Sequence, residues 1–274
     1  MKKLISVLLL CVVSFAYAGV DEGVAAYQKG NYTIALKEFK KAAQQGDAYA
    51  QFNLGLMYYE GEGVPQDYAK AMSWYLKAAE QGNASAQYSL GLMYADGRGV
   101  PQDDSQAVVW YTKAAEQGVV SAQFNLGNMY VDGQGVPQDD SQAFVWYTKA
   151  AEQGFAKAQF NLGVMYDNGQ GIPQDDSQAV AWYKKAAEQG DASAQYNLGL
   201  MYAKGEGVPQ NYKLAYILFN LAASKGGDNA VKVRDITLDK LTPAERADAQ
   251  RISTRLYNSK NFAAELRKVL NSKK

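Results

Sequence analysis

The sequence of 274 residues contains no histidine and only one cysteine, Cys11. Nucleophilic catalysis most often pairs a serine or cysteine with a histidine base, so the commonest catalytic arrangements are missing. Cys11 lies in an N-terminal apolar run that we expect to be removed, which leaves no cysteine for a disulfide. Packing must therefore hold the mature fold together, and the composition argues against an enzyme.

The chain also lacks an excess of charge of either sign. It has 28 Lys and Arg against 28 Asp and Glu, and removing Lys2 and Lys3 leaves 26 basic residues against 28 acidic ones. Nucleic-acid binding needs clustered Lys and Arg, and anionic lipid attracts a polybasic stripe. We therefore expect no nucleic-acid partner, and the sequence has no polybasic stripe for anionic lipid.

Long apolar runs are absent beyond the N-terminus. There, Lys2 and Lys3 precede an apolar run over residues 4–15, and a small-x-small signature follows at residues 16–18. This pattern predicts a signal peptide that is cleaved after Ala18. The run is too short for a permanent membrane anchor, so we expect a periplasmic or secreted protein.

What the chain has in abundance is repetition. The motif KAAEQG begins at Lys77 and returns every 36 residues at Lys113, Lys149 and Lys185, and a looser copy begins at Lys41. Such a period is typical of solenoids, in which each unit packs on its neighbours. We predict a capping half-repeat over 19–30, five repeats, and a partial sixth repeat with C-terminal capping helices over 211–274. The five repeats are 31–66, 67–102, 103–138, 139–174 and 175–210.

Each repeat is predicted to contain two helices. In the third repeat, Asp103 is a suitable N-cap for the first helix, and Gly118 is a suitable left-handed residue after its end. The apolar stripe of that helix comprises Ala107, Trp110, Tyr111, Ala114 and Ala115. The second helix carries Ala122, Leu126, Met129 and Tyr130 on one face. A glycine recurs within this second helix and predicts a close approach, with the paired alanines of the first helix as its neighbours; it stands at Gly55, Gly91, Gly127, Gly163 and Gly199.

The repeated pattern resembles the Sel1-like repeat, a relative of the tetratricopeptide repeat. The residues that carry the resemblance read A-x-x-W-Y-x-K-A-A-E-Q-G followed by A-Q-F-N-L-G-x-M-Y-x-x-G-x-G-V-P-Q-D. The resemblance implies an all-α, right-handed α-solenoid whose second helices line the concave side. It also implies an adaptor that assembles complexes or contacts a host factor. Beyond the repeats, a capping box at Thr242-Pro243-Ala244-Glu245 predicts a helix to about Asn258, and another is predicted from Phe262 to Leu270.

Positions that vary between the copies on the second helix are candidates for partner binding. With the aromatic row that lies between them, they form the candidate site for a protein or peptide partner. These residues are Tyr49, Phe52, Leu56, Tyr59, Ser85, Tyr88, Leu92, Ser121, Phe124, Asn128, Val131, Lys157, Phe160, Val164, Asp167, Ser193, Tyr196 and Leu200. Two alternatives stay open: neutral drift of solvated positions, and packing of the aromatic rings between adjacent repeats. The apolar turn residues Val119, Val120 and Phe155 are a second candidate contact.

An enzyme is the competing function class. Cysteine-rich secreted relatives of this repeat are associated with penicillin binding and β-lactam hydrolysis, but their cysteines are absent here and no Ser-x-x-Lys occurs. The acidic pair Asp103-Asp104 and its repeats lack the spacing of a calcium loop, and helix capping explains them. We therefore predict no catalytic residues, no metal and no cofactor. The sequence favours a non-enzymatic, monomeric scaffold.

Overall fold

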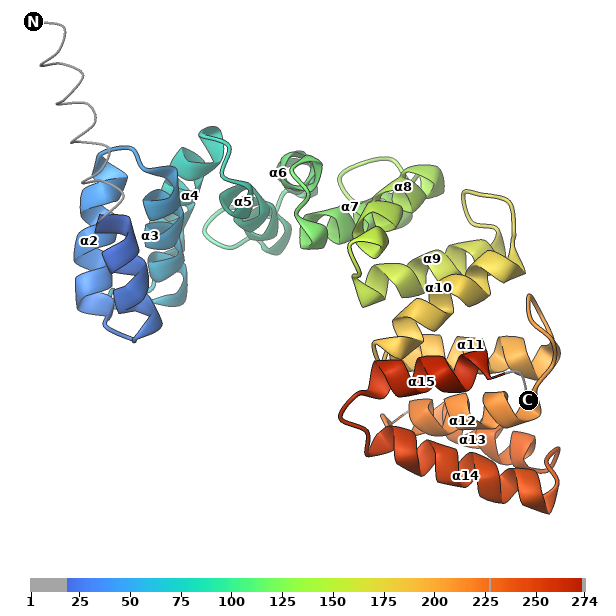
Figure 1. Cartoon of the computed structure of the whole chain (residues 1–274). Helices are drawn as coiled ribbons and strands as arrows, with labels where there is room; N and C mark the ends of the chain where they lie inside the picture. The colour runs from blue at the N-terminus through green and yellow to red at the C-terminus, as the bar shows by residue number, and fades with distance from the viewer. Residues whose placement is uncertain (1–18, 227, 273–274) are drawn as a thin grey trace, which may run out of the picture. The chain divides into compact units, whose positions relative to one another are not determined.

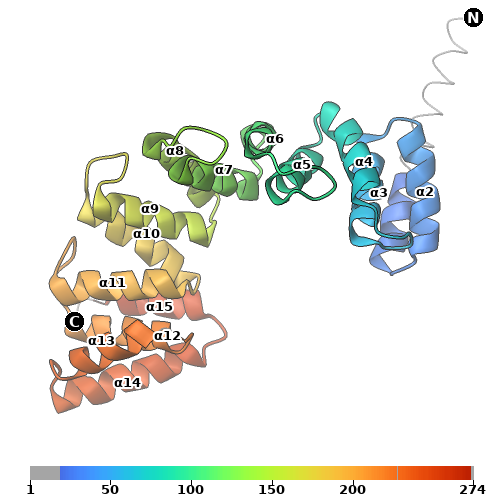
Figure 2. The same ribbon diagram turned by 180° about the vertical axis from the view of Figure 1, so that it is seen from behind.

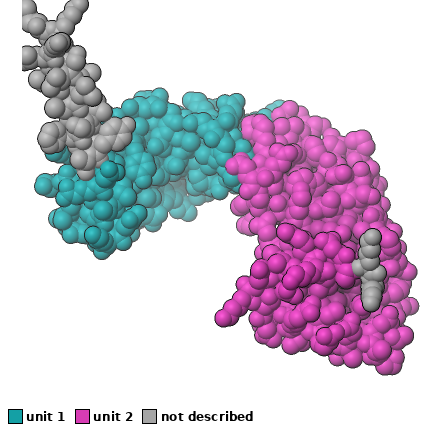
Figure 3. Space-filling model, viewed as in Figure 1, with its two compact units in different colours: residues 1–138 teal, residues 139–274 magenta. Residues whose placement is uncertain are grey.

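The computed structural model describes residues 19–226 and 228–272. These residues form helices joined by turns and contain no strand, so the predicted all-α class is confirmed (Figure 1). The chain divides into two compact units, residues 1–138 and 139–274 (Figure 3). The predicted signal peptide, residues 1–18, lies outside the described residues.

The first unit contains the N-terminal half of the repeats. A helix over residues 19–28 precedes the others. The helices that follow are α2 (Tyr32–Gln44), α3 (Ala48–Glu60), α4 (Tyr68–Glu80), α5 (Ala84–Asp96), α6 (Asp104–Glu116) and α7 (Val120–Asp132). Each of α2 to α6 packs against the next helix in the sequence, as a solenoid requires.

The second unit contains the remaining repeats and the C-terminal cap. Its helices are α8 (Asp140–Glu152), α9 (Ala156–Asn168), α10 (Asp176–Glu188), α11 (Ala192–Lys204), α12 (Tyr212–Ala223), α13 (Asp228–Leu238), α14 (Pro243–Tyr257) and α15 (Phe262–Asn271). Helix α12 contacts α11, α13 and α14, and α15 folds back onto α10 (Figures 1 and 2). The sequence motifs did not predict α13, which occupies the place of a second helix in the sixth repeat.

The predicted helix boundaries follow from local capping. Asp103 accepts a hydrogen bond from the backbone N–H of Gln106 at 2.9 Å, and α6 ends just before Gly118, whose φ is +88°. At α14 the predicted capping box is present, since Thr242 and Glu245 cap each other's backbone N–H groups. Short-range side-chain bonds of this kind satisfy the free groups at helix ends, so the sequence marks them well.

The predicted close approach at the helix glycines is confirmed, but their expected neighbours are wrong. For Gly127 we expected the paired alanines Ala114 and Ala115. In the structure a Cβ on the equivalent Gly91 would lie 2.4 Å from Cδ1 of Tyr111. Tyr111 belongs to the first helix of the following repeat, so the glycine admits a ring from the next repeat.

Buried glutamines join adjacent repeats by a chain of hydrogen bonds that we call the glutamine ladder. Gln87 donates from Nε2 to the carbonyl of Ala79 at 3.2 Å, and its Oε1 accepts from Nε2 of Gln117 at 2.6 Å. Gln81 binds Gln51 in the same way at 2.8 Å. Both polar ends of the buried amides of Gln51 and Gln87 are thereby satisfied, which burial of a polar group requires.

Candidate partner-binding face

In each unit the candidate site residues lie on one side of its second helices, which are α3, α5 and α7 in the first unit and α9 and α11 in the second. We call this side the second-helix face of that unit. In the N-terminal row, Tyr49, Ser85, Lys157 and Ser193 are exposed and Ser121 is half-buried. A second row is half-buried throughout and comprises Leu56, Leu92, Asn128, Val164 and Leu200. A third row, Tyr59, Val131 and Asp167, is also half-buried. By contrast, the neighbouring leucines Leu54, Leu90, Leu126, Leu162 and Leu198 are fully buried.

The aromatic row has a structural role in both units. Its members are Phe52, Tyr88, Phe124, Phe160 and Tyr196, all half-buried. Phe52 lies 5.7 Å from the ring of Tyr75, and Phe160 lies 6.0 Å from the ring of Tyr183. Each contact joins a second helix to the first helix of the next repeat, so ring packing between repeats accounts for part of each side chain.

Hydrogen bonds fix the polar groups beside these rings. The hydroxyl of Tyr183 donates to Oδ2 of Asp167 at 3.1 Å and accepts from Nδ2 of Asn197 at 3.0 Å. Burial raises the pKa of Tyr183, so the hydroxyl stays protonated and remains a donor. In the first unit, Arg98 donates to the hydroxyl of Tyr59 at 2.5 Å. Asp167 and Tyr59 are therefore already engaged within the fold.

Three candidate residues meet in one pocket of the second unit. Phe160, Ser193 and Tyr196 line a pocket of about 320 Å³ together with Asn197. Its other walls are Ala192, Ala222, Asn229 and Ala230. Two rings and three alanines supply apolar lining, and one serine and two asparagines supply polar groups. Such a pocket suits an apolar side chain whose backbone hydrogen-bonds to the polar groups.

Sequence reasoning missed the part of this pocket that α12 and α13 supply. Asn229 follows Ser193 by one repeat length and therefore continues the N-terminal row. The motif letters change beyond Gly226, so the row appeared to end at Ser193. Extending the 36-residue register past that point identifies Asn229.

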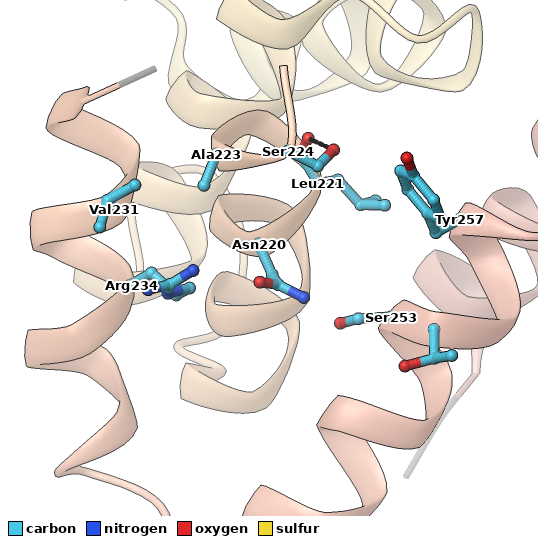
Figure 4. A pocket seen from close by; sticks show the side chains of 9 residues that line it. Asn220, Leu221, Ala223, Ser224, Val231, Arg234, Ser253 and Tyr257 are labelled. Carbon is cyan, nitrogen blue, oxygen red and sulfur yellow. Dashed lines mark hydrogen bonds between the residues drawn. The ribbon is translucent and has the colours of Figure 1, made fainter. Parts of the chain in front are cut away.

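A second pocket lies among the C-terminal helices. Figure 4 shows Arg234 of α13 on one side of Asn220 and Leu221, with Ser253 and Tyr257 of α14 on the other. This pocket has a volume of about 350 Å³. None of its lining residues belongs to the predicted site, because it forms where the repeat pattern has ended.

The apolar turn residues differ from their equivalents in capping. Asp47, Asn83 and Asp191 each accept a hydrogen bond at the start of a second helix. Val119 and Phe155 begin α7 and α9 without a side-chain cap, and both are half-buried. Helices α7 and α9 therefore lack the side-chain N-cap hydrogen bond that α3, α5 and α11 have.

Comparison with known proteins assigns the repeat. Six consecutive stretches match the Sel1 repeat: residues 18–47, 48–83, 84–119, 120–155, 156–191 and 192–227. The chain belongs to the Sel1 repeat family. The family's repeat begins at the second helix, so its phase differs from our five-repeat division of residues 31–210.

Two solved Sel1-type structures are similar to the chain over most of its length. The protective antigen c5321 of uropathogenic Escherichia coli, which displays an SLR fold, is 39% identical with a TM-score of 0.78, over 92% of this chain. A Sel1 repeat protein from Oxalobacter formigenes is 34% identical with a TM-score of 0.76, over 86% of this chain and 99% of its own. The predicted α-solenoid fold is thus confirmed.

Some of these relatives are longer than this chain. The chain spans 56% of the length of c5321. The DAP3-binding cell death enhancer 1 of Rattus norvegicus is 36% identical over 63 residues, which are 23% of this chain and 12% of that protein. Sel1 repeat proteins mediate protein interactions, and the Sel1 solenoid is typically a non-enzymatic scaffold. Among the described residues, none of the helices has both the length and the apolar composition that crossing a bilayer requires.

Proposed function

We propose that this Sel1 repeat protein is a non-enzymatic scaffold that binds a protein or peptide on its second-helix face. The pocket lined by Phe160, Ser193 and Tyr196 carries this proposal, because it brings aromatic side chains and polar groups together. An extended peptide would place an apolar side chain between the rings and satisfy its backbone at Ser193 and Asn197. No cofactor or metal takes part in this function.

Single charged substitutions test the location of the site. Ser193 is exposed at the pocket, so Ser193→Arg should block the pocket while stability changes by less than about 0.5 kcal/mol. Ala181 is exposed on the first helix α10, and Ala181→Arg adds the same charge away from the pocket. Bait proteins carrying each change would be crosslinked in envelope extract and their partners identified by mass spectrometry.

The two variants give opposite outcomes if the proposal holds. A protein captured by the wild type and by Ala181→Arg, but lost with Ser193→Arg, supports the second-helix face. Equal capture by both variants would place binding elsewhere and make Val119, Val120 and Phe155 the better candidates. Asn128→Arg in the first unit and Val164→Arg in the second, both at half-buried positions of the second row, test the second-helix face of each unit.

We also propose that the protein is exported and acts as a monomer in the periplasm or outside the cell. The charged start, apolar run and small-x-small signature of residues 1–18 support export. The mass of the protein recovered from the envelope fraction should match a chain beginning at Gly19. A chain that retains residues 1–18 would contradict cleavage, and light scattering would measure the oligomeric state.

A further inference from the structure

The glutamine ladder shows how a primary carboxamide is held between two repeats. Nε2 of Gln189 donates to the carbonyl of Gly154 at 2.8 Å and to Oε1 of Gln159 at 2.8 Å. Gln159 donates in turn to the carbonyl of Ala151 at 3.1 Å. One NH₂ group thus satisfies two acceptors, a backbone carbonyl and a buried amide oxygen.

The ladder ends one repeat later with an unsatisfied acceptor. Gln195 is 0% exposed and donates to the carbonyl of Ala187 at 3.2 Å, but its Oε1 has no partner. The residue one repeat after Gln189 is Lys225, whose ammonium donates to the carbonyl of Gly190. Lysine therefore replaces one of the two ladder bonds and leaves the other acceptor unpaired.

Gln195 lines a pocket between the last regular repeat and the C-terminal cap. Gln195, Gly190 and Lys225 form its polar end, and the pocket volume is about 440 Å³. Its apolar walls are Leu221, Leu256 and Phe262. Volumes of about 300–1,000 Å³ are usual for sites that hold small ligands.

We propose that this pocket binds a primary carboxamide, such as the side chain of a glutamine whose own carboxylate is free. The ligand NH₂ group would donate to the carbonyl of Gly190 and to Oε1 of Gln195, as Gln189 does one repeat earlier. Lys225 is exposed and its ammonium occupies the carbonyl of Gly190, so it must release Gly190 as the ligand enters. Its ammonium then pairs with the ligand carboxylate, and the ligand methylenes contact Leu256 and Phe262.

Two matched probes test the chemistry of the site. N-acetyl-L-glutamine carries the carboxamide and the carboxylate, whereas N-acetyl-L-glutamate has nearly the same shape without the NH₂ donors. Titration of the full chain, followed by NMR, should show that N-acetyl-L-glutamine binds at least about tenfold more tightly than N-acetyl-L-glutamate, because the glutamate cannot form the two hydrogen bonds from the NH₂ group. Equal affinity for the two probes, or no binding of either, would overturn the proposal.

Two substitutions at Lys225 locate the site. Lys225→Gln places the chain's own carboxamide on Gln195 and Gly190, so binding of N-acetyl-L-glutamine should be lost. Lys225→Ala removes the cover and the ammonium but keeps both acceptors, so the preference for glutamine over glutamate should persist. Circular dichroism would confirm that both variants remain helical. Binding that survives in Lys225→Gln, or a preference lost in Lys225→Ala, would show that Gln195 is not the acceptor.

Discussion

The last regular repeat, residues 175–210, and the segment that follows it share a backbone pattern but not a sequence. Helices α11 and α13 begin one repeat length apart, at Ala192 and Asp228. Ala194 and its equivalent Ala230 are both buried. The arrangement of helix pairs therefore continues into a segment that no longer carries the repeat motif.

The contacts inside this shared pattern differ. Leu198 is fully buried in α11, whereas its equivalent in α13 is the half-buried Arg234. Gly199 lies under the ring of Phe219, whereas its equivalent Asp235 is exposed. At the end of the solenoid, the buried alanine of the second helix is retained as Ala230. The leucine and glycine that pack closely in α11 are replaced by Arg234 and Asp235 in α13.

The largest difference in the free energy of unfolding should come from truncating the side chains at positions 198 and 234. Leu198→Ala should lower the free energy of unfolding by about 2–5 kcal/mol, because it opens a cavity in a closely packed core. Arg234→Ala, at the equivalent position of α13, should change it by less than about 1 kcal/mol. Urea unfolding of the full chain measures both, and similar losses would show that α13 packs as tightly as α11.

Adding one methyl group at the glycine should also distinguish the regions. A Cβ at Gly199 would lie 2.6 Å from Cε1 of the buried Phe219, so Gly199→Ala should cost about 1–3 kcal/mol through overpacking. Asp235→Ala should be close to neutral. The double variant with Phe219→Leu tests the cause: a cost that is no smaller in that background would mean that the ring is not responsible.

Signals that act within a few residues were readable from the sequence. The N-cap at Asp103, the capping box at Thr242 and the buried Leu198 each follow from spacing along one helix. These features are predictable because the residues that produce them are neighbours in the chain. The period of the repeats followed from the recurrence of KAAEQG every 36 residues, and the Sel1 family followed from the resemblance of the repeated motif.

Contacts between helices of different repeats could not be predicted from spacing along one helix. The ring of Tyr111 above Gly91, and that of Tyr183 beside Phe160, depend on how far two helices approach. Helix α13 was missed because Arg234 and Asp235 stand where earlier repeats have leucine and glycine. The candidate face stays a prediction, and the packing partners of its aromatic row required the structure.

Residues 189 and 225 occupy equivalent positions of the glutamine ladder, and exchanging Gln and Lys at them should change the free energy of unfolding in opposite directions. Lys225→Gln should raise the free energy of unfolding by about 1 kcal/mol, because the orphaned Oε1 of Gln195 gains a donor. Gln189→Lys should lower it by about 1–3 kcal/mol, because Oε1 of Gln159 loses its donor. Thermal unfolding measures both changes. Destabilisation by Lys225→Gln would mean that the ladder geometry does not extend to the sixth repeat.

Acid should weaken the C-terminal cap through Asp248, which joins α14 to α12. Asp248 binds Arg251 and also lies 3.3 Å from Nζ of Lys213 at the start of α12. The hydrogen bond from Arg251, helped by Lys213, lowers the pKa of Asp248 below its ordinary value of 3.8. A lowered pKa gives stability that is present at neutral pH and is lost as the pH falls through and below 3.8.

The expected size of this effect is small, because both partners of the carboxylate are partly exposed to water. Asp248→Asn should cost a few tenths of a kcal/mol at pH 7 and less at a pH well below 3.8, because the wild-type carboxyl takes up its proton as the pH falls through its lowered pKa. Hydrogen exchange should place the loss in α14, while α10 and α11 keep their protection. Arg251→Gln should reduce the pH dependence of the wild type in the same helix. A loss that is equal at both pH values would mean that the Asn side chain disturbs packing, and that charge does not hold the cap to the last repeat.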